Sequence, residues 1–524
     1  MPSLNWIGKE KIVNHDKEVP FRLLRKNKKF SLGNSENLIL EGDNLEALKA
    51  LMPFYYGKIK CIYIDPPYNT GNEKWVYNDK VNSPKIKEWF KKVVGPEGED
   101  LTRHDKWLCM MYPRLKLLKD LLSNDGVIFV SIDDNEHCYL RQIMDDIFEG
   151  RVDFMVWRKS GDDRYGKMKN TTTFRKDHEY ILVAYKKDIK LNKLIEKPNF
   201  QNEYSNPDND PRGPYKAGSI SRREEASNPN HENFYTVISP KGRKITRQFD
   251  FSKKDFDLLD KDKRIYWGKD NDSIPQQKIF LNESRSITPY SVLLNHGSTY
   301  SGKMELENLF GNSNLFPNPK PSSLIRTLIQ LATSKDSFIL DSFAGSGTTA
   351  HAVLDLNKED GGNRKFILVE LEKNIAKNIT AERVKRVARG YSYKTGKGKT
   401  VNVPGLGGGF EYVELGEPLF DKDGMISKAV SFENMARYVY FTETRTNLEK
   451  KNIKGNYLGE FSSSHYFLLF NGINNNVLDR KFLNELKGKD GRKIIYADKC
   501  LLDEEVLEKH QIVFKQIPYQ VRVY

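Results

Sequence analysis

The sequence contains little cysteine, because only four of its 524 residues are of this type: Cys61, Cys109, Cys138 and Cys500. No two form a Cys-x-x-Cys pair and none has a histidine at metal-ligand spacing, so we expect small buried side chains rather than disulfides or zinc ligands. Long apolar runs are also missing. No stretch approaches the roughly 20 residues of a membrane-spanning helix, and the N-terminus lacks the apolar core of a secretion signal. These absences predict a protein of the reducing cytoplasm, without a membrane anchor or a metal site.

The composition is that of a large, basic, folded chain. Hydrophobic residues make up 38 % of the sequence and aromatic residues 11 %, which excludes a disordered protein. The formal net charge is +14, from 85 lysines and arginines against 71 acidic residues. A positive charge favours a polyanionic partner such as nucleic acid. A chain of this length is expected to form roughly two to four domains.

Strands and helices alternate along much of the chain. Apolar strands are expected at 37–43, 59–65, 126–134, 154–159, 178–187 and 365–372, and helices at 44–55, 107–126, 135–149 and 322–333. A further strand, turn and helix are expected within 337–357. This alternation predicts an α/β fold, a doubly wound parallel sheet with helices on both faces.

Other stretches interrupt the alternation. The first 36 residues are polar, and five positive charges at 22–29 predict either a solvated arm or a phosphate contact. The middle of the chain is rich in Asn, Asp, Pro and Gly, and a glycine-rich linker, VPGLGGG, follows residue 400. We therefore expect an arm at 1–36, a sheet domain in two parts at 37–190 and 316–400, an insert at 191–315 and a small α/β domain at 401–524.

The first motif that carries chemistry is Asp65-Pro66-Pro67-Tyr68. It stands at the carboxyl end of an apolar strand, where open α/β sheets bind ligands. Two prolines remove two backbone donors and leave a rigid turn with two acceptors, the Asp65 carboxylate and the Pro66 carbonyl. Such a pocket suits an exocyclic amino group, since two acceptors take its hydrogens while Tyr68 stacks on its ring. The alternative is a stiff turn with one exposed acid.

The second motif, DSFAGSGTT at 341–349, follows a strand and opens a helix. Gly345 and Gly347 let a ligand approach the backbone closely, and the helix N-terminus adds a favourable field. Glu370 follows Gly345 by 25 residues and suits an acid that accepts from ribose hydroxyls. The motif lacks the lysine of a P-loop, which argues against an NTPase and favours a nucleoside without a polyphosphate. The alternative is a plain glycine-rich turn. In a doubly wound sheet the two motifs can be neighbours despite their separation.

Together, D-P-P-Y and D-x-F-A-G-S-G-T-T resemble the motifs of S-adenosylmethionine-dependent amino-methyltransferases of DNA. The order, with D-P-P-Y first, is similar to the permuted β class. The flanking stretches EGDNLEAL, KWLCMMYPRLKLLKDLL, HEYILVAYKK and PKPSSLI resemble the modification subunits of type III restriction–modification systems. The similar stretches cover roughly 37–190 and 315–390. The resemblance implies a Rossmann-like methyltransferase sheet with permuted motif order.

The resemblance also implies roles for matching residues. Those implied to hold S-adenosylmethionine are Asp43, Lys320, Asp341, Phe343, Gly345, Gly347 and Glu370. Among them, Glu370 would bind the ribose, Asp43 would lie near the adenine and Lys320 would help to hold the methionine end. The alternative for Asp43 is an ordinary acid at a strand end, and the alternative for Lys320 is an ordinary loop lysine. Those implied to act on the target amine are Asp65, Pro66, Pro67 and Tyr68. The aspartate of D-P-P-Y suggests adenine N6, with cytosine N4 as the alternative.

The insert at 191–315 lies where this family has its target-recognition domain, and its basic and aromatic pieces suit contacts to DNA. Residues 384–400 hold six positive charges and no negative ones, and are interpreted either as a strip along the DNA backbone or as an exposed loop. The partners implied are double-stranded DNA, whose target base would be flipped out, a possible restriction subunit and a second copy of the chain. The expected location is a prokaryotic cytoplasm, with nucleoid association through DNA.

Three other functions remain as alternatives. A DNA-recognition subunit of a restriction complex, with methylation secondary or lost, is disfavoured by the intact motifs. A bifunctional restriction enzyme is disfavoured because only 36 residues precede the first expected sheet strand and Asp479-Arg480-Lys481 lacks an upstream partner acid. An RNA or protein methyltransferase, whose relatives often carry N-P-P-Y instead, is disfavoured by the large insert and the permuted motif order.

Overall fold

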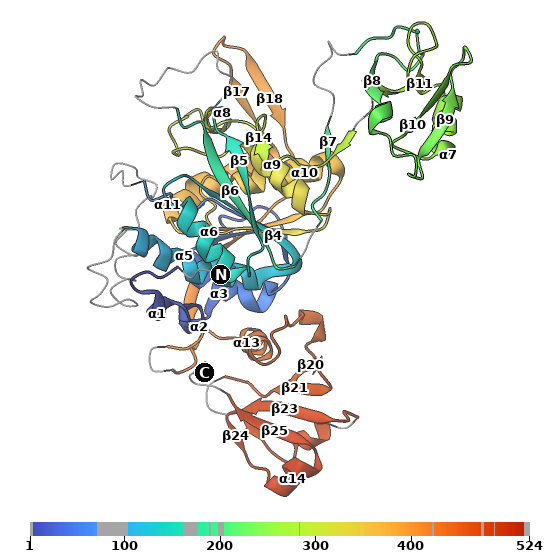
Figure 1. Ribbon diagram of the computed structural model, residues 1–524. Coiled ribbons are helices and arrows are strands. Elements are labelled where there is room, and N and C mark those ends of the chain that lie inside the picture. Colours follow the sequence, from blue (N-terminus) through green and yellow to red (C-terminus); the bar gives the residue numbers. More distant parts are fainter. Residues whose placement is uncertain are drawn as a thin grey trace. The chain divides into compact units, whose positions relative to one another are not determined.

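The computed structural model describes residues 4–70, 103–160, 175–187, 190–196, 204–281, 283, 285–421, 424–472, 476–486 and 488–517 (Figure 1). It divides into two compact units, Met1–Leu191 with Tyr290–Tyr524, and Asn192–Pro289. The second unit ends before the expected boundary at 315, because residues 292–293 already pair with a strand of the first unit. The expected arm and C-terminal domain are likewise parts of the first unit.

A ten-stranded sheet forms the centre of the first unit. Its strands, in spatial order, are β1 (Arg22–Lys26), β19 (Glu411–Pro418), β2 (Leu38–Glu41), β16 (Lys365–Glu370), β15 (Phe338–Asp341), β3 (Ile59–Ile64), β4 (Leu122–Ile132), β6 (His178–Tyr185), β5 (Val152–Arg158) and β14 (Val292–Leu293). The strands from β19 to β4 are parallel, whereas β6 is antiparallel to both its neighbours. The expected doubly wound α/β sheet is confirmed.

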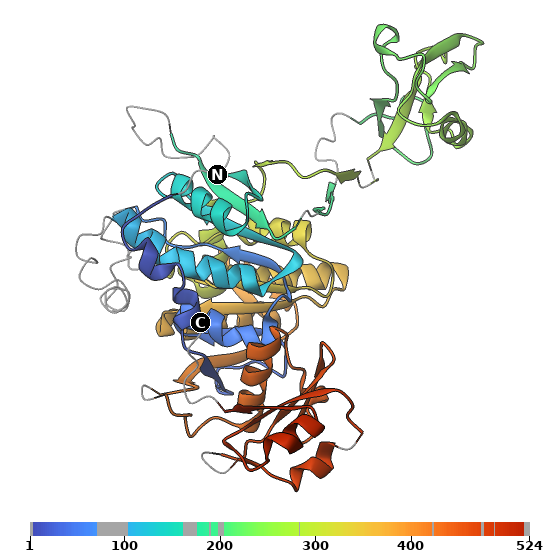
Figure 2. The same cartoon turned by 60° about the horizontal axis from the view of Figure 1, so that its bottom comes forward.

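Helices cover both faces of this sheet (Figure 2). One layer consists of α3 (Asn44–Tyr55), α5 (Arg103–Leu121) and α6 (His137–Ile147), and the other of α9 (Ser322–Ala332), α10 (Thr348–Asp360) and α12 (Ala381–Arg389). Side chains alternate along each strand, so that Ile62 and Ile64 pack with the first layer while the equally buried Cys61 and Tyr63 face the other side. None of the helices among the described residues has an apolar stretch that could span a bilayer.

The cysteines differ from one another in exposure. Cys61 and Cys109 are buried as expected, and Cys500 is partly buried. Cys138 is exposed, which corrects the expectation for this residue. The reason is its position on α6, which turns Leu140 and Ile143 toward the core and leaves Cys138 off that face.

The basic run at 22–29 contributes an edge strand to the sheet and not a free arm. β1 pairs antiparallel with β19. Arg22 pairs with Glu46 at 2.9 Å, and Lys26 pairs with Glu411 at 2.7 Å. Arg25 also forms an ion pair, with Glu417 of β19. The run therefore belongs to the sheet and each of these three charges has an acidic partner, although the side chains of Arg25 and Lys26 remain largely exposed.

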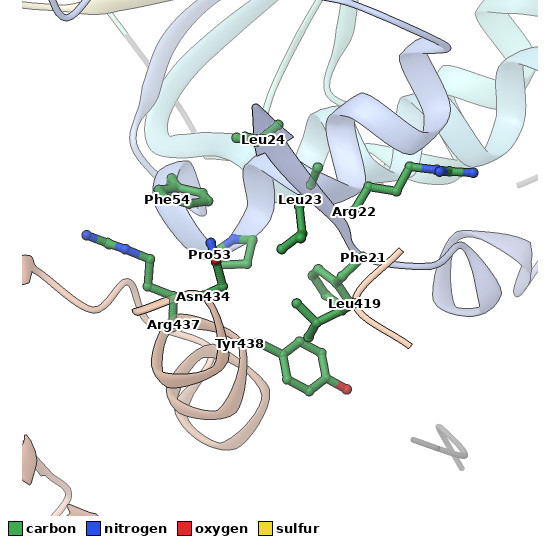
Figure 3. Close-up of a pocket in the computed structure, with 11 residues that line it drawn as sticks. Phe21, Arg22, Leu23, Leu24, Pro53, Phe54, Leu419, Asn434, Arg437 and Tyr438 are labelled. Atoms are coloured by element: carbon green, nitrogen blue, oxygen red, sulfur yellow. The ribbon is translucent and has the colours of Figure 1, made fainter. Parts of the chain in front are cut away.

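The C-terminal part begins after β19, because that strand completes the main sheet instead of belonging to a separate domain. It comprises α13 (Phe432–Thr444), a sheet of β20 (Tyr457–Phe461), β21 (Ser464–Leu468), β23 (Arg492–Ala497) and β25 (Ile512–Gln516), and α14 (Glu504–Lys509). Leu23 of β1 shares a hydrophobic cluster with α13. A hollow beside this contact is lined by Phe21, Pro53, Leu419 and Tyr438, among others, and contains neither motif (Figure 3).

The second unit is a small β-rich body. It contains a three-stranded sheet of β11 (Ile265–Tyr266), β12 (Gln276–Phe280) and β8 (Tyr215–Ser219), a hairpin of β9 (Phe234–Ile238) and β10 (Lys244–Gln248), and helix α7 (Lys253–Lys261). Its first and last strands, β7 (Leu194–Glu196) and β13 (Arg285–Ile287), pair antiparallel, so the chain enters and leaves through one two-stranded ribbon. A short connection of this kind is typical of a domain that is inserted into a surface loop of another domain.

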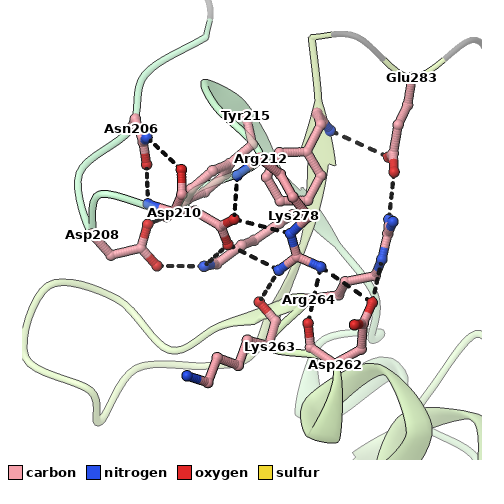
Figure 4. A network of polar contacts seen from close by, with 11 residues as sticks. Asn206, Asp208, Asp210, Arg212, Tyr215, Asp262, Lys263, Arg264, Lys278 and Glu283 are labelled. Atoms are coloured by element: carbon pink, nitrogen blue, oxygen red, sulfur yellow. Dashed lines mark hydrogen bonds and ion pairs between the residues drawn. The ribbon is translucent and has the colours of Figure 1, made fainter.

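An ionic network stabilises the second unit (Figure 4). Lys278, which is only 5 % exposed, lies 2.5 Å from Asp208 and 2.8 Å from Asp210. Arg212 donates to both oxygens of Asp210 at 2.9 Å and lies over the Phe280 ring. These basic side chains are committed to folding, because a buried charge requires a partner. Lys278 is thereby shielded from an external polyanion, whereas the Arg212 side chain remains 31 % exposed.

Candidate active site

The two sequence motifs meet at one edge of the main sheet. β15, which leads into Asp341, pairs parallel with β3, which leads into Asp65. From β15 the chain proceeds through α10 to β16 on one side, whereas β3 is followed by β4 on the other. The strand order thus reverses between β15 and β3, and such a switch point opens a ligand crevice at the carboxyl ends of the strands. The expectation that the motifs are neighbours is confirmed.

Side chains from distant parts of the sequence converge on Asp65. The Lys320 Nζ donates to both carboxylate oxygens, at 2.8 Å and 2.7 Å. The Tyr68 hydroxyl lies 2.9 Å from Asp65 Oδ1 and 2.9 Å from Lys320 Nζ. The ammonium is also 5.0 Å from the centroid of the Tyr68 ring. Asp65 and Tyr68 are therefore together as predicted, but Lys320 joins this motif with its side chain and not the glycine motif.

Glu179 completes this cluster and was missed by the sequence reasoning. It is the second residue of β6 and is 9 % exposed. Its Oε2 lies 3.0 Å from the Tyr68 hydroxyl and 3.5 Å from Lys320 Nζ, and its Oε1 lies 3.3 Å from Lys159 Nζ. The only signal in the sequence was an acid at the polar start of the strand HEYILVAY. The centre thus contains two carboxylates and two ammonium groups close to one phenol.

The protonation of these groups follows from burial and from their mutual charges. Burial raises the pKa of Asp65, and Lys320 opposes that shift. Burial would lower the pKa of Lys320, but Asp65 and Glu179 outweigh it, so the pKa of the lysine is raised and it stays charged at neutral pH. Burial disfavours the charged form of Glu179, but Lys320 and Lys159 outweigh this effect and lower its pKa. Both acids therefore have a cation beside them in the resting pocket.

The turn after Asp65 is fixed by buried donors. Trp107 of α5, fully buried, donates its indole N–H to the Pro67 carbonyl at 2.6 Å. Asn69 has a left-handed φ of +56° and donates to the carboxylate of Glu136, which is 0 % exposed. His104 lies 2.7 Å from that same carboxylate. These contacts brace the proline turn, as a preorganised acceptor site requires.

Backbone groups hold the glycine motif in place. Gly345 N–H donates to Glu370 Oε2 at 2.8 Å, and Glu372 N–H donates to Glu370 Oε1 at 2.9 Å. Gly345 and Gly347 have φ of +50° and +79°. A Cβ on Gly347 would lie 3.2 Å from the Thr380 methyl group. The glycines are thus required by a left-handed turn, and Glu370, predicted to bind a ribose, also braces that turn.

Asp341 is the buried acid of this turn. Its Oδ1 accepts from Phe343 N–H at 3.0 Å and its Oδ2 from the Thr349 hydroxyl at 2.5 Å. Burial raises the pKa of Asp341 to about 7. A carboxyl with such a pKa is about half ionised at neutral pH, and its charge responds to anything bound beside it.

A second buried residue missed by the sequence reasoning is Arg383 of α12. Its guanidinium donates to Ser346 and Thr348 of the glycine motif, at 3.0 Å and 2.8 Å, and pairs with Glu305 at 2.8 Å. The Thr348 hydroxyl donates in turn to the backbone carbonyl of Lys320 at 3.2 Å. Lys320 therefore connects the two motifs, with its backbone at the glycine motif and its ammonium at Asp65.

Asp43 lies at the third strand end along the same edge. It caps α3 by accepting from the backbone N–H of Leu45 and Glu46, at 2.9 Å and 3.2 Å, and pairs with Arg114 at 3.3 Å. β2, β16 and β15 are adjacent in the sheet. Asp43, Glu370 and Asp341 therefore follow three neighbouring strands, and this edge is lined by acids.

Comparison with known proteins shows the family to which this chain belongs. The family model described as DNA methylase matches residues 59–382, which hold both motifs. The chain therefore belongs to the DNA methylase family. More particularly, it is 36 % identical over 366 residues to the StyLTI Mod subunit of a type III restriction-modification enzyme from Salmonella typhimurium, covering 67 % of this chain and 54 % of that protein.

Two further relatives support the same placement. The chain is 33 % identical over 434 residues to the EcoPI Mod subunit of Escherichia phage P1, covering 72 % and 65 % of the two chains. It is 31 % identical over 374 residues to the type II methyltransferase M.KpnI of Klebsiella pneumoniae, covering 67 % and 84 %. The resemblance to type III modification subunits is thus confirmed, and the chain spans between half and two thirds of the length of the Mod subunits named here.

Proposed function

We propose that this protein is a site-specific DNA methyltransferase that transfers a methyl group from S-adenosylmethionine to adenine N6 in double-stranded DNA. The observation that carries the proposal is the placement of the D-P-P-Y turn and the glycine turn on the adjacent strands β3 and β15. One turn offers acceptors for a flat amine, and the other offers a backbone cradle for a nucleoside. Relatives named as Mod subunits and as a type II methyltransferase support the same reaction.

The acid-lined edge fits S-adenosylmethionine. Gly345 and Gly347 open the backbone at the start of α10, and Asp43, Asp341 and Glu370 end neighbouring strands. Acids suit the hydroxyls and the positive sulfonium of this cofactor, whereas a polyphosphate would require a lysine in the turn. Phe343, half-buried beside the glycines, offers an apolar contact. When bound, the cofactor supplies a methyl group activated by the sulfonium.

The residues of the proline turn act on the target amine. The adenine must leave the duplex, which costs a few kcal/mol of stacking and pairing. Asp65 and the Pro66 carbonyl then accept the two N6 hydrogens, while Tyr68 stacks on the ring. These contacts make the nitrogen lone pair available above the ring plane. Asp65 is placed to take the proton that the amine loses on methylation, so catalysis depends on alignment and electrostatics.

Exposed basic residues outside the ionic network suit contacts to the DNA backbone. The hairpin β17 (Gly390–Lys394) and β18 (Thr400–Pro404) presents Lys394, Lys397 and Lys399 to solvent. In the second unit, Arg222 and Lys244 are also exposed. We assign target recognition to the second unit, whose single ribbon connection suits a reading module.

By analogy with its relatives, the proposed partners are a restriction subunit and a second copy of this chain, in a prokaryotic cytoplasm near the nucleoid.

The test is methylation of duplex DNA by the purified protein with labelled S-adenosylmethionine, followed by single-molecule sequencing of the product. The proposal predicts N6-methyladenine in one recurring sequence context. N4-methylcytosine in one context would instead establish the second candidate, which the shared family description leaves open. Tight DNA binding without any methyl transfer would overturn both and favour a recognition subunit.

A further inference from the structure

The resting position of Lys320 conflicts with the proposed role of Asp65. Both Asp65 oxygens accept from the Lys320 ammonium, at 2.8 Å and 2.7 Å. The same ammonium lies 5.0 Å from the centroid of the Tyr68 ring. A base amino group that donates to Asp65 and stacks on Tyr68 needs the space and the acceptor that the lysine now uses. We therefore expect the lysine to move when the base enters.

A second acceptor for this ammonium is already in place. Glu179 Oε2 lies 3.5 Å from Lys320 Nζ, so a shift of under roughly 1 Å would bring the pair to the ordinary 2.7–2.9 Å of a charge-assisted hydrogen bond. The carboxylate is buried and held from its other side by Lys159 at 3.3 Å. The lysine stem is flexible enough for such a shift.

We propose that Lys320 is a two-position cation, which pairs with Asp65 in the empty pocket and with Glu179 when a base amine occupies Asp65. Glu179 is then a positioning residue for the methyl transfer, since it acts through Lys320. This inference rests on the proposed function. It also explains why the buried carboxylate of Glu179 lies beside the D-P-P-Y motif although Glu179 is not part of that motif.

The energetic reason is the cost of a buried charge without a partner. Lys320 is 9 % exposed, so an ammonium displaced from Asp65 into an apolar space would lose both its partner and its hydration. With Glu179 present, the lysine exchanges one carboxylate for another and the net charge of the cluster is unchanged. Without Glu179, Lys320 would remain on Asp65 and compete with the incoming amine.

The experiment compares Glu179→Gln, Glu179→Asp and the double variant Glu179→Gln with Lys320→Met in single-turnover methylation at saturating cofactor. Glutamine keeps the shape and can accept from Tyr68, but it offers no charge to Lys320. We expect Glu179→Gln to reduce the rate about 100-fold, the scale for losing one preorganised polar group. Glu179→Asp should recover part of that loss. The double variant should be faster than Glu179→Gln alone, because removal of the ammonium frees Asp65.

The control is Glu443→Gln, which removes a comparably shielded carboxylate paired with Lys515 at 2.7 Å in the C-terminal part. It should leave the methylation rate unchanged. Calorimetric cofactor binding and circular dichroism of each variant separate misfolding from a pocket effect. If wild type methylates DNA but the double variant is no faster than Glu179→Gln alone, this inference is overturned alone. If wild type transfers no methyl group, the proposed function falls and the inference with it.

Discussion

The ends of β3 and β15 lie side by side, and each carries an aspartate that is satisfied in a different way. Asp341 accepts from Phe343 N–H and the Thr349 hydroxyl, both within eight residues of it. Asp65 accepts from Lys320, which is 255 residues away in the sequence. A locally satisfied acid stabilises one rigid turn. An acid paired with a distant side chain can exchange that partner for a ligand, which is what a substrate pocket requires.

The glycine turn is accordingly a preformed cradle. Its donors and acceptors include backbone groups, the buried Glu370 and the buried Arg383 guanidinium. The proline turn has a preformed backbone, held by Trp107, but its charges are balanced by side chains that other elements supply. We therefore expect changes at the two strand ends to separate cofactor binding from methyl transfer, and the following variants test that separation.

The largest effect is expected from Asp65→Ala. Loss of the acceptor removes both the alignment of the amine and the proton acceptor, so methylation should fall by about 1,000-fold or more. Calorimetry should still detect cofactor binding of near wild-type affinity, because no contact of the glycine turn is altered. Near-normal turnover in Asp65→Ala would contradict the proposed role of this strand end.

The opposite separation is expected from Gly347→Ala. Alanine at φ +79° is strained, and its Cβ would press on Thr380, so the turn must shift. Cofactor affinity should fall about tenfold, which corresponds to roughly 1.4 kcal/mol. The matched control is Gly361→Ala at the other end of α10, with φ +67° and open space around the added atom. It should cost similar backbone strain and leave cofactor affinity unchanged; equal losses in both variants would mean that Gly347 is not part of the cradle.

A smaller effect on the transfer step alone is expected from Trp107→Phe. The Pro67 carbonyl would lose its indole donor, at a cost of about 1–2 kcal/mol, and the proline turn would be less well fixed. We expect a decrease in the methylation rate of about tenfold, with cofactor affinity unaffected. Thermal unfolding should be recorded beside the rate, since a large drop in the midpoint would indicate general damage to the core around α5.

The smallest effect concerns the pH dependence of stability. The pKa of Asp341 is raised by burial from 3.8 to about 7, so between these values the folded protein binds more protons than the unfolded chain. This group therefore favours folding at low pH and progressively less as pH rises toward 7. Asp341→Asn removes that dependence. The unfolding midpoint of the variant minus that of wild type should increase from pH 5 to pH 8; a constant difference would show that Asp341 is not perturbed.

The local features of both strand ends were predictable from the sequence. Apolar strands that end in Asp65 and Asp341, a stiff proline turn and a glycine turn before a helix are all written within a few neighbouring residues. Even the adjacency of the two motifs followed from the topology of an alternating α/β sheet. Asp43, by contrast, was predicted only for its role near the cofactor, and its capping of α3 and its pairing with Arg114 emerged from the structure.

The class of fold, the two turns and the acids at the strand ends could be predicted from the sequence, because each depends on the hydrophobic periodicity and backbone preferences of a short segment. The side chains that neutralise those acids became evident only in the folded structure. Glu179 reaches Tyr68 across 111 residues, and the arginines of β1 pair with glutamates of β19 and α3. Ion pairing depends on which side chains share a low-dielectric space after folding, and spacing along the chain carries no signal of it. The charge of the resting pocket is for that reason a property of the fold.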